Sequence, residues 1–483
     1  MRAPLSGPGG SGAAPDGLSC RRLAVLGPRL FDFVPLLRDV DPEVMIACEG
    51  GPDAEGLAAR AGARLCSAET LTDRRSHWVN ADVDGLALLA GGLTGPAAAA
   101  DRDRGRGDRP LTVLAYGATP GWEGAATASE GRMMLVAPAS ALKDRLDDKI
   151  ETRAQLGRLG VPTPRHARVA GAGLEFAALA HRFGSPFVLQ EPVGASGVGT
   201  FEVGDPSGLE PVRRRALSVP WWLVSTRLTG PVVNIHGLVG RGGVALSPPS
   251  VQLSGVPELS VTSSSYNGND FGAAADLAPG VVASVDRNAA EIGRWLATLG
   301  YLGVFGVDFV AVGPEAYALE VNPRLQGSTW LLGEVERRAG RTPMMIRHFL
   351  ELLGTPSSSP AATFVAGRRE SSGGANLVVR WRGPSAIRID GHPLPGVHAV
   401  GPGGALEYRR PAMGLLECTG DEVLVHGLPP SPRAVVEPSA PLARVASWRR
   451  LAAPDGRSLT GYGRAVVDAV AGAFGGLPEP GGR

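Results

Sequence analysis

Two neighbouring runs of alternating residues, 304–312 and 316–321, constrain the fold of this chain more than any other stretch. Each alternates apolar residues with small or acidic ones, which is the period-2 pattern of half-buried strands. The residues between them read Gly-Pro-Glu and predict a turn, so we expect a hairpin. A hairpin centred on Pro314 places Asp308 opposite Glu320, because each lies six residues from that centre, although a register slip of one residue stays open.

The carboxylates of Asp308 and Glu320 would repel each other across such a sheet, and a cation between them reverses that effect. Asn322 shares the face of Glu320, and an amide with two carboxylates makes an oxygen-rich site that suits Mg²⁺. Arg324 follows, where its guanidinium can meet a phosphoryl group. The alternative is an exposed acidic edge with a solvated arginine. We favour that alternative for either carboxylate alone and a metal–phosphate site for the complete string.

The composition excludes several classes of function. The 483 residues are enough for about three domains, and 43% of them are hydrophobic, so the chain can bury cores. The 48 basic and 47 acidic residues leave a net charge of +1, which predicts no nucleic-acid partner and no membrane partner. Four cysteines without metal-like spacing fit a reduced cytoplasm. Residues 1–18 read as a disordered tail rather than a signal peptide, and the apolar run at 86–100 is too broken by Gly and Pro to span a bilayer.

Only two of the 48 basic residues are lysines, Lys143 and Lys149. A lysine kept in such an arginine-rich chain points to a role that arginine cannot fill. We predict one helix over residues 141–159, in which apolar residues at every fourth position form a buried stripe with Lys149 at its edge. From spacing alone, a surface lysine paired with a neighbouring acid is as well supported as a functional one.

A glycine-rich loop at residues 191–200 separates two predicted strands, 187–190 and 201–203. Glycines let a backbone approach a ligand closely, and consecutive amides can form an anion-binding nest. The candidate phosphate contacts around this loop are Gln190, Gly194, Ser196, Gly197, Gly199 and Thr200. A strand–loop–strand unit differs from the Walker motif, in which a helix follows the loop. A glycine loop by itself is weak evidence.

These motifs, in this order, resemble those of the ATP-grasp enzymes. The string Glu-Val-Asn-Pro-Arg at 320–324, about twelve residues after Asp308, is close to the most recognisable signature of that superfamily. The pair Asp-Lys at 148–149, followed by Gly-Val-Pro-Thr-Pro at 160–164, resembles its entry helix. The resemblance covers about residues 20–350 and implies an ATP-grasp fold with ATP and Mg²⁺ as cofactors, Mn²⁺ being able to replace Mg²⁺.

The resemblance also implies roles for single residues. The implied metal ligands are Asp308, Glu320 and Asn322; the implied adenine hinge is Thr226, Arg227 and Leu228; and Gln326, Gly327 and Ser328 face the carboxylate substrate. Lys149 orients the nucleotide phosphates, and Arg324 stabilises the charged intermediate. Two positions depart from the family: Gln190 stands where many members have a second lysine, and Ser225 stands near the place of the usual hinge acid.

The remaining elements set the domain organisation. Four short apolar runs within residues 19–140, each ending in turn residues, predict a mainly parallel Rossmann-like layer before the ATP-grasp domain at residues 141–354. A Pro/Ser/Gly-rich segment at 355–376 reads as a linker, and residues 377–483 read as a smaller β-rich domain. The predicted fold class is therefore α/β, in part α+β.

The polar stretch at residues 247–276 is the candidate for the acceptor-substrate site. A polar segment of this length in a compact domain is usually functional or mobile. We predict a turn at 266–271 and take Asn269 and Asp270 within it as substrate residues. Asn234, on an earlier predicted strand, could also reach the ribose or the substrate.

The implied function is an ATP-dependent carboxylate–amine ligase that forms an amide bond through an acyl phosphate. The long polar stretch and Gln190 look most like peptide ligases of actinobacterial natural-product pathways, such as those of the pheganomycin type. The implied partners are a small-molecule carboxylate and an amino-acid or peptide amine, and a homodimer is possible. Two alternatives stay open: a carboxylase-type enzyme that activates bicarbonate, and a nucleotide-binding regulatory module without turnover.

Overall fold

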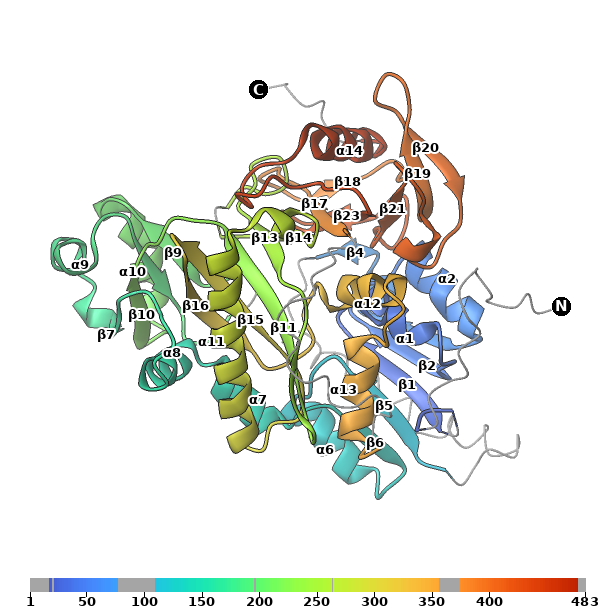
Figure 1. The fold of residues 1–483 in the computed structure, drawn as a ribbon. Coiled ribbons are helices and arrows are strands. Elements are labelled where there is room, and N and C mark those ends of the chain that lie inside the picture. The colour runs from blue at the N-terminus through green and yellow to red at the C-terminus, as the bar shows by residue number, and fades with distance from the viewer. Residues whose placement is uncertain are drawn as a thin grey trace.

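The computed structural model describes residues 17–19, 21–76, 109–194, 197–262, 264–355 and 373–476 (Figure 1). Most of the predicted tail at 1–18, Ser196, and most of the predicted linker at 355–376 lie outside these ranges. Along the chain come a parallel sheet, a small antiparallel sheet and a large central sheet that the C-terminal strands extend. None of the helices in the described ranges is long and apolar enough to cross a bilayer.

Five parallel strands form the N-terminal sheet, in the order β3-β2-β1-β5-β6. They are β1 (Arg22–Gly27), β2 (Val44–Ala47), β3 (Arg64–Ser67), β5 (Leu111–Ala115) and β6 (Met133–Val136). The helices of this part are α1 (Val34–Leu37), α2 (Pro52–Ala61), α3 (Ala68–Thr72) and α6 (Pro120–Ala128). Strands β1, β2 and β5 are buried almost throughout, as in a sheet covered on both faces, and the predicted parallel layer is confirmed.

The predicted single helix over residues 141–159 is wrong, because the segment forms two helices, α7 (Ser140–Asp147) and α8 (Lys149–Arg158). The chain breaks at Asp148, where ψ is 107°, and the carboxylate of Asp148 accepts hydrogen bonds of 2.8 and 3.0 Å from the second and third N–H groups of α8. This is an N-cap, and an Asp followed three residues later by a Glu is the sequence signal that predicts it. The break makes Lys149 the first residue of α8.

A four-stranded antiparallel sheet follows, in the order β7-β10-β8-β9. Its elements are β7 (His166–Ala170), α9 (Phe176–Phe183), β8 (Phe187–Gln190), β9 (Thr200–Val203), α10 (Glu210–Ala216) and β10 (Trp221–Thr226). Phe183, Phe187 and Trp222 are buried in its own small core. The glycine loop joins β8 to β9, so the predicted strand–loop–strand unit is confirmed.

The central sheet runs in the order β16-β15-β11-β13-β14-β17-β23-β21-β19-β20, with β12 paired to β11. Its strands are β11 (Val232–Gly240), β12 (Gly243–Leu246), β13 (Ser250–Ser254), β14 (Tyr266–Asp270), β15 (Gly303–Val312), β16 (Glu315–Asn322), β17 (Ala375–Arg380), β19 (Gly396–Val400), β20 (Leu406–Arg410), β21 (Val423–His426) and β23 (Pro441–Ser447). The predicted turn at 266–271 is therefore wrong, since residues 266–270 form a strand inside this sheet. Strands β17 to β23 extend the sheet across the predicted border between the ATP-grasp and C-terminal domains, and that division stays a prediction.

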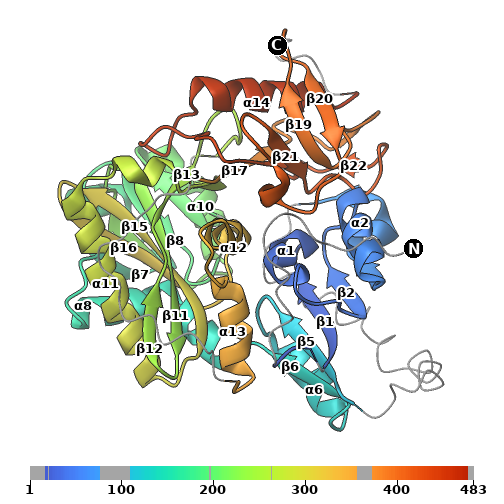
Figure 2. The ribbon, with the colours of Figure 1, turned by 45° about the vertical axis from the view of Figure 1, so that its right-hand side comes forward.

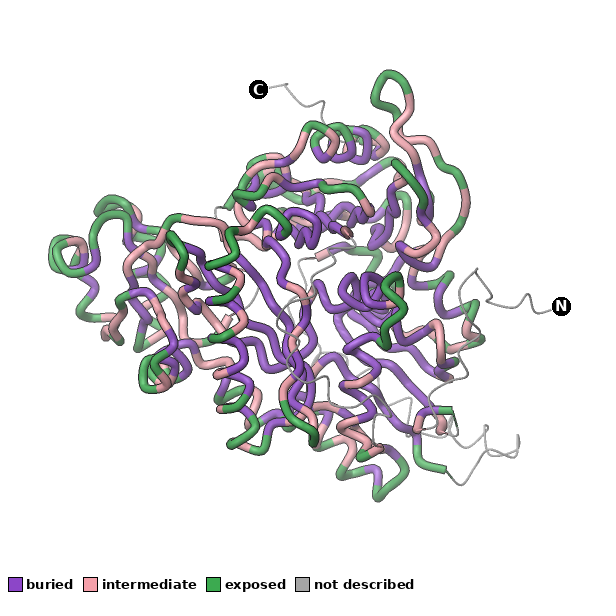
Figure 3. Tube along the Cα trace, in the orientation of Figure 1, coloured by how far each residue is buried: buried purple, intermediate pink, exposed green. Residues whose placement is uncertain are grey.

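Helices cover both faces of the central sheet. Helix α11 (Pro279–Thr298) packs on one face, and α12 (Thr329–Arg338) and α13 (Met344–Leu352) lie between the central sheet and the N-terminal sheet (Figures 1 and 2). Helix α14 (Gly461–Gly472) packs over the C-terminal strands. Figure 3 shows that the strands and the inner helix faces are buried, whereas the loops at the periphery are exposed.

A fourth sheet, of three short strands, ties the N-terminal part to the C-terminal strands. It has the order β18-β22-β4 and consists of β4 (Arg74–Arg75), β18 (Ile387–Arg388) and β22 (Val435–Val436). Strand β22 pairs with β4 in parallel, although about 360 residues separate them.

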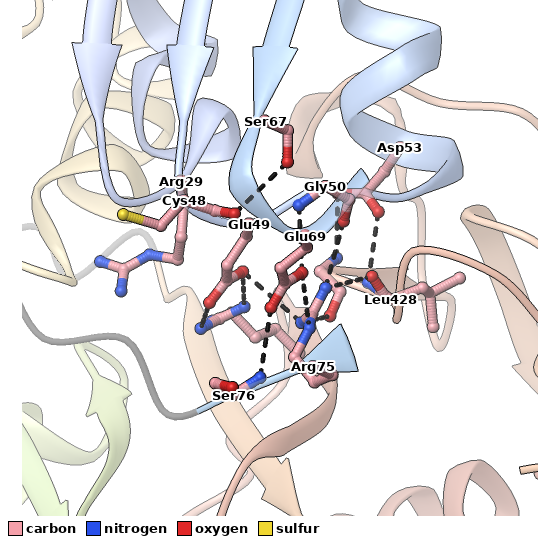
Figure 4. Close-up of polar contacts among 12 residues, drawn as sticks. Arg29, Cys48, Glu49, Gly50, Asp53, Ser67, Glu69, Arg75, Ser76 and Leu428 are labelled. Carbon is pink, nitrogen blue, oxygen red and sulfur yellow. Dashed lines mark hydrogen bonds and ion pairs between the residues drawn. The ribbon is translucent and has the colours of Figure 1, made fainter. Parts of the chain in front are cut away.

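A buried ion network lies next to this sheet (Figure 4). The Nε of Arg75 lies 2.9 Å from the carboxylate of Glu69, and neither side chain is exposed. Glu49 accepts hydrogen bonds of 2.6 and 2.7 Å from the guanidinium of Arg444 in β23. Burial alone raises the pKa of Glu49, but the charges of Arg444 and Arg75 outweigh burial and lower that pKa below its ordinary value. The network is therefore ionised and joins the two ends of the described chain.

We predict that Arg75→Met destabilises the protein far more than Arg74→Met. Loss of Arg75 removes the ion-pair partner of the buried Glu69 and one of the two cations at Glu49, and breaking a buried pair in this way costs about 3–5 kcal/mol. The ion pair of Arg74 with Glu437 is half exposed and is worth about 0–1 kcal/mol. Urea unfolding followed by tryptophan fluorescence compares the two variants, and equal midpoints would contradict the structural role of the network.

Candidate active site

A cavity of about 310 Å³ lies between the four-stranded sheet and the central sheet. Residues of both sheets, of α8, of the N-terminal part and of the C-terminal strands line it. Every site residue predicted from the sequence and described by the structure lines this cavity, except Gly199, Asn234 and Asp270. The motifs that the sequence scatters over 180 residues thus converge on one space.

Three side chains form a row across the strands β11, β15 and β16. Asn234 pairs with Asp308, and Asp308 pairs with Glu320, so the predicted opposition of the two carboxylates is confirmed. The turn is centred between Gly313 and Pro314, which would place Asp308 opposite Leu319. The register shifts by one residue between Asp308 and Phe309, and this β-bulge brings Glu320 into place instead.

The two carboxylates perturb each other. Burial, with a further contribution from the charge of Glu320, raises the pKa of Asp308 well above its ordinary value. Burial also favours a neutral Glu320, but the charge of Lys149, the hydrogen bond from Asp308 and the charge of Arg324 together outweigh burial and lower the pKa of Glu320. Without a cation between them, the two carboxylates share one proton, which favours Asp308, because two adjacent negative charges repel each other.

The donor set fits a divalent cation. A divalent cation can replace the proton on Asp308 and stabilise both negative charges. Mg²⁺ prefers carboxylate oxygens of this kind as ligands. The side-chain nitrogen of Asn322 lies 3.3 Å from Asp308 Oδ2, and its oxygen accepts from Arg324 Nη2 at 3.0 Å. The Asn322 oxygen has a second lone pair, so it can coordinate a cation while it accepts from Arg324. The described part of the chain contains no group of three or more His, Cys, Asp or Glu residues arranged to hold a metal, so further ligands would have to be phosphate and water oxygens.

Lys149 lies where three elements meet. Its backbone N–H donates to the carbonyl of Pro192 at 2.8 Å, and its Nζ donates to the carbonyl of Gly194 at 2.7 Å. The same Nζ lies 3.3 Å from Glu320 Oε2, and the side chain is only 8% exposed. The alternative of a surface lysine applies to Lys143 instead, which pairs with two acids of α7. Lys149 thus connects the glycine loop to the carboxylate row.

The glycine loop packs closely against the segment between β13 and β14. Gly197 has φ of 84°, and a Cβ on it would come within 2.0 Å of the carbonyl oxygen of Ser264, so only glycine fits there. Gln190 Nε2 donates to Thr200 Oγ1 at 3.4 Å, across the two strands that the loop joins. Gly199 faces away from the cavity, because a Cβ on it would meet Glu191.

The predicted hinge residues also line the cavity. Arg227 Nε lies 2.9 Å from Glu202 Oε1, and Arg227 Nη1 donates to Thr229 Oγ1 at 2.7 Å. Thr226 Oγ1 is buried without a hydrogen-bond partner, so it is available to a ligand. Leu228 supplies an apolar contact surface at this end.

Asn234 positions two residues of the site. Its Nδ2 donates to Asp308 Oδ1 at 2.6 Å and to Gln326 Oε1 at 2.8 Å. Gln326 occupies the space over Gly306, where a Cβ would come within 1.9 Å of the Gln326 amide. Gln326 Nε2 is buried without a partner in the described structure, so it is the part of this amide that can meet a substrate.

Asp270 does not serve the cavity. Its Oδ1 accepts from the N–H of Ala273 at 2.8 Å, and its Oδ2 accepts from the N–H groups of Leu451 and Ala452 at 2.9 and 3.0 Å. These bonds tie β14 to the segment before α14. Asn269, one residue earlier and on the other face of β14, does line the cavity, as the alternation of side chains along a strand requires.

Several cavity residues were not indicated by the sequence. Polar residues among them include Arg29, Asp32, Tyr116, Arg153, Arg380 and Arg444. Arg153 lies one helical turn after Lys149 on α8, and that spacing is a signal that could have identified it. The others come from distant segments that only the folded chain brings together.

Comparison with known proteins agrees with this geometry. A family model described as an ATP-grasp domain matches residues 146–328, which hold Lys149, the glycine loop and the carboxylate row. A D-alanine–D-alanine ligase from Moorella thermoacetica is 30% identical over 224 residues, which cover 43% of this chain and 70% of that ligase. The chain belongs to the ATP-grasp family of ligases. The resemblance read from the motifs is thereby confirmed at the level of the family.

Solved structures extend the likeness of this ATP-grasp protein to its other parts. Biotin carboxylase from Campylobacter jejuni has a TM-score of 0.58 at 15% identity, covering 89% of this chain and 87% of that one. The biotin carboxylase domain of 2-oxoglutarate carboxylase from Hydrogenobacter thermophilus, solved with MgADP and bicarbonate, has a TM-score of 0.56 at 13% identity, covering 89% and 86%. At such identities the likeness concerns the fold alone, and the coverage includes more than the ATP-grasp domain.

We predict that Lys149→Met weakens MgATP binding by this ATP-grasp protein, whereas Lys143→Met does not. Loss of one hydrogen bond from a charged group costs about 1.5–3 kcal/mol, or roughly 10- to 100-fold in Kd. Isothermal titration calorimetry of the two variants measures the difference, and Lys143 is a matched control because its charge is satisfied within α7. Equal affinities would remove Lys149 from the nucleotide site.

Proposed function

We propose that this protein is an ATP-dependent carboxylate–amine ligase that forms an amide bond through an acyl phosphate. The observation that carries the proposal is the convergence of Asp308, Glu320, Lys149 and Arg324 in one cavity beneath a glycine loop. This set supplies cation ligands, a phosphate contact and a donor for developing negative charge. Membership in the ATP-grasp family supports it.

Asp308 and Glu320, with Asn322, would hold Mg²⁺, which when bound neutralises charge on the nucleotide phosphates. Lys149 Nζ already points at Glu320 and at the glycine loop, so it can contact a phosphate oxygen there without leaving its place. Gly194, Gly197 and Thr200 line the cavity beside it and would present N–H and O–H donors. Gln190, in place of a second lysine, can hydrogen-bond a phosphate or adenine but adds no charge.

The chemistry has two steps. An oxygen of the substrate carboxylate forms a bond to the γ-phosphorus of ATP while the bond to the β–γ bridging oxygen breaks, giving an acyl phosphate and ADP. The amine nitrogen then attacks the acyl carbon, the carbon–oxygen bond to phosphate breaks, and the amine releases a proton. Arg324, held against Asn322, lies where it can stabilise the oxyanion that forms in between.

The narrower proposal is that the enzyme is a cytoplasmic peptide ligase of natural-product biosynthesis. Gln190 and the segment at 247–276, which contributes Gln252, Ser254 and Asn269 to the cavity wall, support a substrate pocket unlike the commoner family pattern. The partners are then a small-molecule carboxylate and an amino-acid or peptide amine, and a homodimer is proposed as the assembly.

We predict that Glu320→Gln abolishes ADP formation while the protein stays folded, because the change removes one cation ligand and also the repulsion with Asp308. Glu315→Gln is the matched control, since Glu315 is on the same strand but pairs with Arg287 and Ser284 outside the cavity. ADP release is measured with MgATP, pooled amino acids and peptides, and the product is identified by mass. Retained ADP formation in Glu320→Gln would remove the metal assignment.

The same assay separates the alternatives. ADP release that needs bicarbonate and no amine would show a carboxylase-type reaction, and ATP binding without ADP in any mixture would show a module without turnover.

We also predict that Arg324→Ala raises the activation barrier by about 3 kcal/mol, as loss of one oxyanion donor does. That change lowers kcat roughly 100-fold. We expect kcat to fall while the Kd of MgATP changes little. Calorimetry and steady-state kinetics on the same preparation check both quantities. A change in Kd alone would mean that Arg324 serves nucleotide binding instead.

A further inference from the structure

One wall of the cavity is built by the C-terminal strand β17. Asn376, Val378 and Arg380 alternate along it, so their side chains share the face that lines the cavity. Arg444 of β23 lies opposite Val378 in register and lines the cavity as well. The proposed ligase chemistry uses none of these residues.

Arg380 is a buried cation that forms no ion pair in the described ranges, although the charge of Glu49 lies near enough to favour its charged form. Its side chain is 6% exposed, and its two terminal nitrogens donate to the carbonyls of Ser439 at 3.0 Å and Tyr266 at 3.3 Å. Its Nε has no hydrogen-bond partner, and no carboxylate in the described ranges forms an ion pair with it. Burial, with nearby Arg444, lowers the pKa of Arg380 to about 10, so the group stays charged at neutral pH.

The other cations near Arg380 are already paired. Arg444 makes its two hydrogen bonds to Glu49, and Arg29 lies 2.7 Å from the carboxylate of Asp32. One positive charge is therefore left over on this wall. A buried charge without a partner is costly, and proteins seldom keep one unless a ligand supplies the opposite charge.

This wall lies next to the reacting segment. A Cβ on Gly327 would come within 3.6 Å of Tyr266 Oη and within 3.7 Å of Arg29 Nη2. Tyr266 Oη also donates to Asn269 at 2.7 Å, which fixes the ring in the cavity. Arg380 bonds to the backbone carbonyl of Tyr266, so the length of the Tyr266 side chain separates it from the loop that carries Arg324.

We propose that Arg380, with Tyr266 and Arg29 beside it, binds the free carboxylate of the acceptor amino acid or peptide. This inference rests on the proposed ligase function and names the class of its second substrate: an amine that carries its own carboxylate, so that the product ends in a free acid. A planar guanidinium matches a carboxylate in charge and shape.

The acceptor fits this subsite better than the donor does. The donor carboxylate must meet the γ-phosphoryl group beside Asp308 and Glu320, and it loses its charge when the amide forms. The acceptor reacts through its amine, so its carboxylate stays ionised throughout and needs a cation elsewhere in the same cavity. Arg153 and Arg380 both line the cavity in the described ranges as buried cations with an unpartnered nitrogen. Arg153 faces the charge of Glu320 at the nucleotide end, so Arg380 is the one that we assign to the acceptor carboxylate.

A competition experiment tests the proposal. The protein receives MgATP and pooled amino acids as donors, with equal amounts of free amino acids and their carboxamides as acceptors. Mass spectrometry counts products that end in a carboxylate against products that end in a carboxamide. We expect wild type to favour free-acid products by about ten-fold or more, and Arg380→Met to reduce that ratio by about ten-fold.

Arg382→Met is the matched control, because Arg382 is an exposed arginine two residues away that donates to the carbonyl of Pro257. Its product ratio should equal that of wild type. An unchanged ratio in Arg380→Met overturns the proposal, and so does a wild type that uses carboxamides as readily as free acids.

Thermal stability distinguishes binding from a structural role. Without ligand, Arg380→Met should have an equal or higher Tm than wild type, because it removes an uncompensated buried charge. Its KM for the acceptor should rise more than its kcat falls. A lower Tm with an unchanged KM would make Arg380 a structural residue and overturn the subsite.

A measurement without turnover separates this inference from the ligase proposal. Millimolar pooled amino acids, without ATP, should raise the Tm of wild type and not that of Arg380→Met, and the carboxamide pool should raise neither. If that shift appears but no mixture yields ADP, the subsite stands and the ligase proposal fails. If ligation occurs and neither the shift nor the product ratio depends on Arg380, the ligase proposal stands and the subsite fails.

Discussion

The opposition of two carboxylates across β15 and β16 is the constraint on which the rest of the structure depends. Asp308 and Glu320 are paired directly inside the sheet, an arrangement that costs free energy unless positive charge stands nearby. Lys149 reaches them from α8, Asn234 donates from β11, and Arg324 follows on the chain itself. The cations and amides around this pair thus offset the repulsion between its carboxylates.

The site is complete only when distant parts of the chain are held together. The glycine loop and hinge come from the four-stranded sheet, the carboxylates from the central sheet, and Arg29 and Tyr116 from the N-terminal part. The buried ion network of Arg75, Glu49 and Arg444 joins that N-terminal part to the C-terminal strands. Arg444 therefore serves two purposes, since it anchors the network through Glu49 and lines the cavity beside Arg380.

The hairpin, the glycine loop and the parallel layer could be predicted because a local period or turn composition encodes each of them. The pairing of Asp308 with Glu320 also depends on a bulge that no local pattern shows. Strand β14 was missed because its polar side chains bond to neighbours inside the sheet rather than to water. The position of Arg380 in the cavity wall could not be predicted from the sequence. It follows from the pairing of β14 with β17, in which Asn269 lies opposite Asn376, 107 residues later in the chain.

The seam between β14 and β17 has a consequence for recombination of such enzymes. A Cβ on Gly268 would come within 1.9 Å of the carbonyl oxygen of Asn376, so the two strands touch without space for a side chain. The last hundred residues are therefore not an interchangeable module. A chimera that takes them from another enzyme has to inherit β14 as well, and with it Tyr266 and Asn269, so substrate choice and the C-terminal strands would be exchanged as one unit.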